Sequence, residues 1–493
     1  MTFGIDFIWV LGGRVATALI SIASLRILTT LLEPADFGLY ALLLAFHGCA
    51  ALILLSPVGL HINRNMHAWW DENTLLSRLY LFNKYLFFVS VGIAVAVICW
   101  WLIYQATDQN IYGAIFASIA VGLTIFLSTW CGLFVQILNM LGFRAASAGW
   151  MTASSIIGLG FSSLFTYKYH TGTSWLLGQT VGMAVGAIGA GLMLCRYQVG
   201  RKFVVMNFEK LPPLLDRQTI VHYCLPLAIA TGLMWLQNTG YRFWVGGAWG
   251  AAELGLLAVG LSISAQIWAI IETLSMQFLN PYLFRHITDV KSDSQKSVIL
   301  SDMVNIMWPV YAVLAGFNVI FASSLLKMLT NERYHAAVSF VLLGVFIEFF
   351  RCTANLWSYA AQIERSTTKY IWPYGFGAII VWLGAIAITY VNGDIIYIAI
   401  VLAISGFGMC VVMLRVMQFM IPVTLDVRRW AAGAAVLLAC TASVIVIPIR
   451  TDGFIINIGL IILGLIVSGS VMLALLWRNP ALTRLLAVTL RNA

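Results

Sequence analysis

The sequence predicts an all-α polytopic membrane protein with about 14 transmembrane helices, and three observations predict it. Hydrophobic residues make up 61% of the 493 residues and charged residues only 10%, and the mean hydropathy is +0.92. A water-soluble domain of this length needs more polar surface. Apolar runs of about twenty residues, enough to cross ~30 Å of hydrocarbon as a helix, recur along the chain. Membrane barrel strands are shorter and alternate in polarity, so helices are favoured.

The apolar runs define the spans, with ends good to a few residues. The first run is too long for the apolar part of a signal peptide, and no small-residue cleavage site precedes Glu33, so we expect it to remain. The predicted spans are 7–32, 38–60, 79–104, 111–137, 145–168, 174–195, 219–246, 252–280, 298–325, 336–362, 370–391, 394–421, 428–448 and 453–477.

Positive charges predict the orientation of these spans. Twenty of the 28 lysines and arginines lie in or beside the gaps after even-numbered spans and the C-terminal tail, and four lie in or beside the other gaps. This asymmetry predicts that both termini lie in the cytoplasm and that the basic loops at 61–78, 196–218 and 281–297 are cytoplasmic. The formal charge of +9 then reflects topology, so nucleic acid is not expected as a partner. The eight cysteines have no metal-ligand spacing and are interpreted as packing residues.

An internal repeat predicts two similarly oriented halves. The turn at 33–42 (EPADFGLYAL) follows span one, and the turn at 250–259 (GAAELGLLAV) follows span seven, 217 residues later. Each turn has a glycine two positions after a carboxylate. Since six helices separate them, the repeat is parallel, as in many transporters whose substrate path runs between the halves. Chance similarity of two acidic turns is the alternative. The predicted organisation is two six-helix lobes, 1–195 and 219–421, related by a parallel pseudo-two-fold repeat. A basic linker, 196–218, joins them, and two C-terminal helices with a tail follow at 422–493.

Several segments resemble a known family. RILTTLLEPADFGLYALLLA (26–45), SPVGLHINRN (56–65), the stretch 225–264 and NERYHAA (331–337) are similar to polysaccharide exporters and oligosaccharide-lipid flippases. These form the Wzx-like branch of the multidrug/oligosaccharidyl-lipid/polysaccharide exporter superfamily. The resemblance covers spans 1–12 and implies two six-helix lobes around a central cavity. One departure is Tyr241 before Arg242, where many relatives have Asp, so a carboxylate role there is not carried over.

Span ten carries the most informative polar side chains. Glu348, Arg351, Asn355 and Gln362 lie within about 60° of one another on a helix, and such a stripe cannot face lipid. One interpretation is a cavity-lining anion site in which Arg351 contacts phosphate and Glu348 tunes or releases it. The other is a salt bridge buried between helices.

Other ionisable side chains within the spans are also candidates. Arg14 in span one either lines the path or contacts a neighbouring helix. Arg26 and Arg242 lie near the outer ends of spans one and seven, where they either anchor the helix at the interface or contact phosphate. Glu272 in span eight, like Glu348, is a candidate carboxylate for a coupling proton or sodium ion, or alternatively the partner of an arginine on another helix.

The sequence contains no Walker A motif. Glycosyl ligases that act on lipid-linked sugars share a large outer loop with catalytic groups, and the outer gaps of this chain are too short for such a loop. We therefore expect no enzyme activity, no cofactor and no metal. The resemblance implies a flippase of the bacterial inner membrane for a polyprenyl-diphosphate-linked oligosaccharide, which works by alternating access in surface polysaccharide (O-antigen or exopolysaccharide) assembly. Its implied partners are membrane lipids and other polysaccharide-assembly membrane proteins. The alternatives are a cation-coupled multidrug exporter, a peptidoglycan-precursor flippase, and a membrane glycosyltransferase or ligase.

Overall fold

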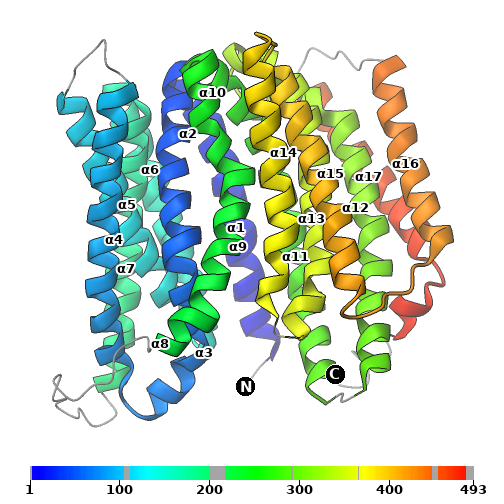
Figure 1. Cartoon of the computed structure of the whole chain (residues 1–493), viewed down its shortest axis with the longest axis horizontal. Helices are drawn as coiled ribbons and strands as arrows, with labels where there is room; N and C mark the ends of the chain where they lie inside the picture. The colour runs from blue at the N-terminus through cyan, green and yellow to red at the C-terminus, as the bar shows by residue number, and fades with distance from the viewer. Residues whose placement is uncertain are drawn as a thin grey trace. The chain divides into compact units, whose positions relative to one another are not determined.

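Helices form every regular element that the computed structural model describes (Figure 1). The structure describes residues 3–104, 111–199, 217–289, 292–364, 366–446 and 454–484. Within these ranges, fourteen helices are long and apolar enough to cross a membrane, one for each predicted span. The predicted all-α class and the number of spans are therefore confirmed, and the chain is a multi-pass membrane protein.

The chain divides into two compact units, Met1–Gly255 and Leu256–Ala493, called unit 1 and unit 2 below. The seventh span falls in unit 1 with the first six. Residues 200–216 of the predicted linker 196–218 lie outside the described residues, as does the tail from 485 onward. The helices of unit 1 are α1 (Phe3–Leu31), α2 (Pro34–Cys49), η1 (Ala50–Leu55), α3 (Ser56–Asp71), α4 (Leu75–Tyr104), α5 (Ile111–Met140), α6 (Arg144–Tyr169), α7 (Gly172–Val199), α8 (Arg217–Thr219), η3 (Ile220–Cys224), α9 (Leu225–Trp235), η4 (Leu236–Gly240) and α10 (Tyr241–Trp249).

Unit 2 begins within α11 and contains the remaining spans. Its core gathers large side chains from α11, α12 and α13, among them Trp268, Tyr311 and Trp357, all at most 2% exposed. Its helices are α11 (Ala251–Asp289), α12 (Asp293–Leu329), η5 (Glu332–Ala337), α13 (Val338–Ile363), η6 (Thr367–Tyr370), α14 (Ile371–Tyr390), α15 (Ile396–Gln418), α16 (Val427–Val446) and α17 (Phe454–Leu476).

Two segments predicted as loops are largely helical, which corrects the predicted loops 61–78 and 281–297. The second span continues through α3 to Asp71, and α11 continues to Asp289. In α3, the buried residues Ile62, Met66 and Trp69 follow the spacing i, i+4, i+7, whereas Arg64 is exposed. This is an amphipathic helix. Average hydropathy misses it because the polar face cancels the apolar one.

Two of the membrane helices of unit 1 contain π-helical turns: η1 follows α2, and η3 and η4 flank α9. A π turn widens the helix and frees backbone carbonyls that need other donors. The Thr231 hydroxyl of α9 donates to the Leu52 carbonyl in η1 at 2.7 Å, and the Tyr85 hydroxyl of α4 donates to the Leu54 carbonyl at 2.8 Å. Side chains from two neighbouring helices therefore satisfy the widened turn.

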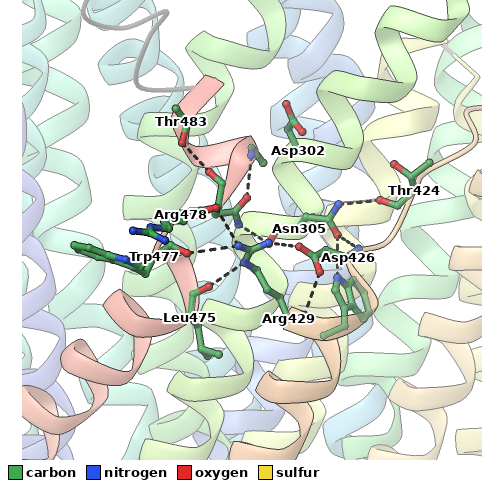
Figure 2. A network of polar contacts seen from close by, with 12 residues as sticks. Asp302, Asn305, Thr424, Asp426, Arg429, Leu475, Trp477, Arg478 and Thr483 are labelled. Atoms are coloured by element: carbon green, nitrogen blue, oxygen red, sulfur yellow. Dashed lines mark hydrogen bonds and ion pairs between the residues drawn. The ribbon is translucent and has the colours of Figure 1, made fainter.

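In unit 2, α16 and α17 are tied to α12 by a polar network that Figure 2 shows from close by. Asn305 of α12 is its centre. Its Nδ2 donates to the Thr424 carbonyl at 2.8 Å, and its Oδ1 accepts from the Asp426 backbone N–H at 2.9 Å and from Trp430 Nε1 at 3.1 Å. The loop before α16 is thereby fixed on α12.

The end of α17 and the segment that follows it join the same network. Arg429 Nε donates to the Leu475 carbonyl at 3.1 Å, and its guanidinium also pairs with Asp426 (Figure 2). Arg484 Nε donates to Asp302 Oδ2 of α12 at 2.8 Å. We call the contacts of Asp302, Asn305 and Arg429 the clasp.

Candidate functional site

Two carboxylates and one guanidinium meet in unit 2, between α11 and α13. Arg351 Nε donates to Glu348 Oε2 at 2.7 Å, and Arg351 Nη2 donates to Glu272 Oε2 at 3.0 Å. One positive group against two negative groups gives a formal charge of −1. The structure thus adds Glu272 of span eight to the stripe predicted on span ten.

Asn355 completes this group by holding the second oxygen of Glu272. Its Nδ2 donates to Glu272 Oε1 at 2.7 Å, so both oxygens of that carboxylate are engaged. Glu348, Arg351 and Asn355 stand at i, i+3 and i+7 of α13, which places them on one face of the helix. Gln362, predicted at the end of the stripe, has an exposed side chain near the end of α13. We call Glu272, Glu348, Arg351 and Asn355 the acidic cluster.

The charged side chains of the acidic cluster are neither fully buried nor exposed. The exposed fractions are 28% for Arg351, 22% for Glu272 and 14% for Glu348. Phe349 and Cys352, which follow Glu348 and Arg351 in the sequence, are buried. Part of each charged side chain is therefore left uncovered by the described protein atoms, and the opposite charges are paired with one another within the cluster.

This geometry bears on the two interpretations of span ten. A phosphate beside Arg351 would also meet two carboxylates, and two of the three guanidinium nitrogens already donate to them. The excess negative charge favours a cation or a proton over an anion. Glu272 pairs with Arg351 on another helix. This pairing is the second of the two roles predicted for Glu272, the first being a ligand of a coupling ion. A role of these residues in binding stays a prediction.

Arg242 of α10 lies in a different environment in unit 1. Its side chain is half-buried, and within the described part of the chain it has no carboxylate partner. Its Nη1 donates to the Ala41 carbonyl at 3.4 Å, a long hydrogen bond, and its Nε is buried without any hydrogen bond. A guanidinium with unused donors can take an anion in two-point contact.

The two arginines of α1 are both exposed. Arg14 makes no ion pair with the residues that the structure describes. The carbonyl of Arg26 accepts hydrogen bonds from the hydroxyls of Thr29 and Thr30 at 3.1 and 2.7 Å. The roles predicted for them, lining the substrate path or contacting a helix for Arg14 and interface anchoring or phosphate contact for Arg26, stay predictions.

The clasp was not predicted from the sequence. Asp302 and Asn305 lie in the first eight residues of the predicted span 298–325, and Arg484 lies in the predicted C-terminal tail, so no pattern in the sequence connects them. For a metal ion, the described ranges contain no group of three or more His, Cys, Asp or Glu side chains suited to hold one.

Comparisons with known proteins find the fold among solved structures. Neither a protein-family model nor a curated sequence matches the chain. The structure of a lipid II flippase MurJ in an inward closed conformation is similar over 96% of this chain and 100% of that chain, with 12% identity and a TM-score of 0.64.

Two further transporters of the MOP superfamily give similar matches. An inward-facing multidrug resistance transporter of the MATE family of the MOP superfamily matches 87% of this chain and 95% of its own, with 13% identity and a TM-score of 0.52. A MOP superfamily transporter from Pyrococcus furiosus, described as having a binding pocket of reverse polarity, matches 85% of this chain and 94% of its own, with 14% identity and a TM-score of 0.51. The resemblance predicted from the sequence is confirmed for the fold: the chain has the fold of the transporters of the multidrug/oligosaccharidyl-lipid/polysaccharide exporter superfamily.

Proposed function

We propose that the chain is a flippase for a polyprenyl-diphosphate-linked oligosaccharide. It would move this lipid from the inner to the outer leaflet of a bacterial cytoplasmic membrane, by alternating access and with both termini in the cytoplasm. The product would serve assembly of a surface polysaccharide, alongside other membrane proteins of that assembly. The fold shared with a lipid II flippase supports the transporter class.

The observation that carries the choice of cargo is Arg242. A diphosphate that enters a low-dielectric path needs a compensating charge, and a guanidinium supplies one that does not titrate. Arg242 is a half-buried cation in a membrane helix with unused donors and no carboxylate partner in the described ranges. Arg351, by contrast, already donates to two carboxylates. Phosphate contact is therefore assigned first to Arg242, with Arg14 and Arg26 as further candidates.

The acidic cluster would hold the coupling ion. Its formal charge of −1 is balanced by one proton or one sodium ion. Arrival of that cation at Glu272 or Glu348 would weaken the hold of the carboxylate on Arg351. The two units would then divide the work, with anionic cargo in unit 1 and cation exchange in unit 2.

A cation-coupled multidrug exporter is the second candidate. The negative charge of the acidic cluster suits a cationic cargo as well as a coupling ion, and one of the similar folds belongs to a multidrug resistance transporter. A peptidoglycan-precursor flippase shares the need for a phosphate-binding arginine, so the sugar attached to the lipid has to be varied in the assay.

Liposomes containing the purified chain and a fluorescent polyprenyl-diphosphate-linked disaccharide test the proposal. A membrane-impermeant reductant bleaches the outer-leaflet probe, and transport makes the inner-leaflet probe accessible. We expect Arg242→Ala to slow transport roughly ten- to hundredfold, the loss of one or two charged hydrogen bonds. The matched control is Arg415→Ala, because Arg415 is exposed near the end of α15 and should be dispensable.

Three outcomes decide between the candidates. No probe movement by the parent protein contradicts the flippase. Movement that is equal in Arg242→Ala and the parent removes Arg242 from the phosphate contact. Movement of a lipophilic cationic dye, but not of the lipid, supports the multidrug exporter.

A further inference from the structure

The two turns of the internal repeat come into direct contact in unit 1. α2 begins at Pro34 and α11 begins at Ala251, so the repeat offset of 217 residues relates the first residues of the two helices. The same offset relates Gly38 to Gly255, one turn further along each helix. Both glycines are buried.

The contact is reciprocal. A Cβ atom added to Gly38 would lie 1.9 Å from the Ala251 carbonyl oxygen, and one added to Gly255 would lie 1.9 Å from the Pro34 carbonyl oxygen. The next neighbours repeat the pattern, with the Gly255 nitrogen 3.1 Å from the first added Cβ and the Gly38 nitrogen 3.1 Å from the second. Equal distances in both directions mean that a local two-fold axis passes between the two glycines.

Only glycine allows this approach of the backbones. A Cβ at 1.9 Å from a carbonyl oxygen is far inside van der Waals contact, and the obstacle is backbone that cannot turn away. The contact has no ionised partner to desolvate, since it is formed by Cα–H groups and carbonyl oxygens. It can therefore close tightly and still open without exposing a buried charge.

α2 is held on its other side. A Cβ added to Gly172, at the start of α7, would lie 2.6 Å from the Asp36 carbonyl oxygen and 2.7 Å from Tyr40 Cβ. The first turn of α2 is thus packed between α7 and α11. Separation of Gly38 from Gly255 then requires the first turn of α11 to move, and α11 runs unbroken from Ala251 to Asp289 with Glu272 on it.

We propose that the contact of Gly38 with Gly255 is the seal that closes the transport path at its outer end. The proposal rests on the proposed transport function. In a parallel repeat the substrate path follows the pseudo-two-fold axis, and a reciprocal contact of equivalent residues lies on that axis. The seal breaks in each cycle when the first turn of α11 leaves α2. Glu272 lies 17 residues after Gly255, or about 25 Å along α11, so the same rigid helix connects the seal to the acidic cluster.

Cysteine labelling in intact cells tests the seal without any substrate. The reporter is Ala258→Cys in an otherwise cysteine-free chain, because Ala258 is 4% exposed and lies one turn beyond Gly255. A membrane-impermeant maleimide should label it slowly in the parent. Gly38→Ala and Gly255→Ala should each raise the labelling several-fold, and by similar factors because the contact is symmetric. The matched control is Gly247→Ala in α10, where an added Cβ has nothing within 4 Å, and it should leave the labelling unchanged.

Abundance in the membrane and elution from a sizing column are measured for every variant. Labelling equal to the parent in both alanine variants at normal abundance overturns the seal. Loss of both variants from the membrane overturns it as well, because the contact is then a requirement for folding. If labelling rises as expected but the parent moves no lipid-linked sugar in liposomes, the seal stands and the proposed cargo is wrong.

Discussion

Arg242 in unit 1 and Arg351 in unit 2 are both arginines in membrane helices, yet their surroundings are opposite. Arg351 donates to Glu348 and Glu272, while Arg242 has only a long bond to a backbone carbonyl. A count of charges in the spans treats the two alike and describes the interior as cationic. The pairing shows that one arginine is neutralised in place and the other retains unused donors. The geometry of the hydrogen-bond partners, rather than the number of charges, therefore separates a candidate ion site from a candidate anion site.

The two arginines should differ most in how their replacement by alanine changes the free energy of unfolding, and Arg351→Ala should have the larger effect. This change leaves two carboxylates facing one another, and we expect the free energy of unfolding to fall by on the order of 2 kcal/mol, between the values for exposed and buried ion pairs. Thermal unfolding in detergent measures it. Adding Glu272→Gln and Glu348→Gln should recover most of the loss. A stable Arg351→Ala protein would show that the pairing does not matter to the fold.

The clasp gives the next largest effect. Asn305→Ala removes three hydrogen bonds and leaves the Trp430 indole and the Asp426 backbone N–H without that acceptor, so we expect a loss of about 1.5 kcal/mol. Asn139→Ala is the matched control, because Asn139 is exposed at the end of α5. Equal unfolding midpoints of the two variants would mean that α16 and α17 are held by apolar packing alone.

Asn355→Ala tests whether Glu272 depends on its second hydrogen bond. We expect a loss of about 1 kcal/mol, since the bond to a charged group is partly exposed to solvent. Asn355→Asp should destabilise more, because it adds a third carboxylate to a cluster that is already negative. The unfolding midpoints of the two variants give the order, and the reverse order would contradict the negative charge assigned to the cluster.

The smallest effect on stability is expected for Arg242→Ala, within about 0.5 kcal/mol of the parent, because the arginine has no ion pair to lose. Together with a large loss of transport, this result would complete the contrast with Arg351. A destabilisation as large as that of Arg351→Ala would instead indicate a structural role for Arg242 and would make the two units alike.

The spans are well predicted from the sequence because a helix that crosses lipid must be long and apolar, and average hydropathy detects such segments directly. It fails at the helix extensions beyond the membrane, such as α3, where burial follows one helix face only. The stripe of Glu348, Arg351 and Asn355 is predictable, since one helix fixes their spacing. The addition of Glu272 is not, because it depends on how α11 packs against α13. The clasp depends on the path of the loop at 419–426, which has no periodicity to read.

The clasp also has a consequence for how the chain is made. The Asn305 carbonyl accepts a hydrogen bond from Asn479, which is synthesised 174 residues later, and Asp302 accepts one from Arg484, 182 residues later. At synthesis rates of about 5–20 residues per second this delay is roughly ten to thirty-five seconds. During that time the polar groups on α12 lack their final partners. Closure of the clasp is therefore a late step of biogenesis that marks a chain whose last two helices have been inserted.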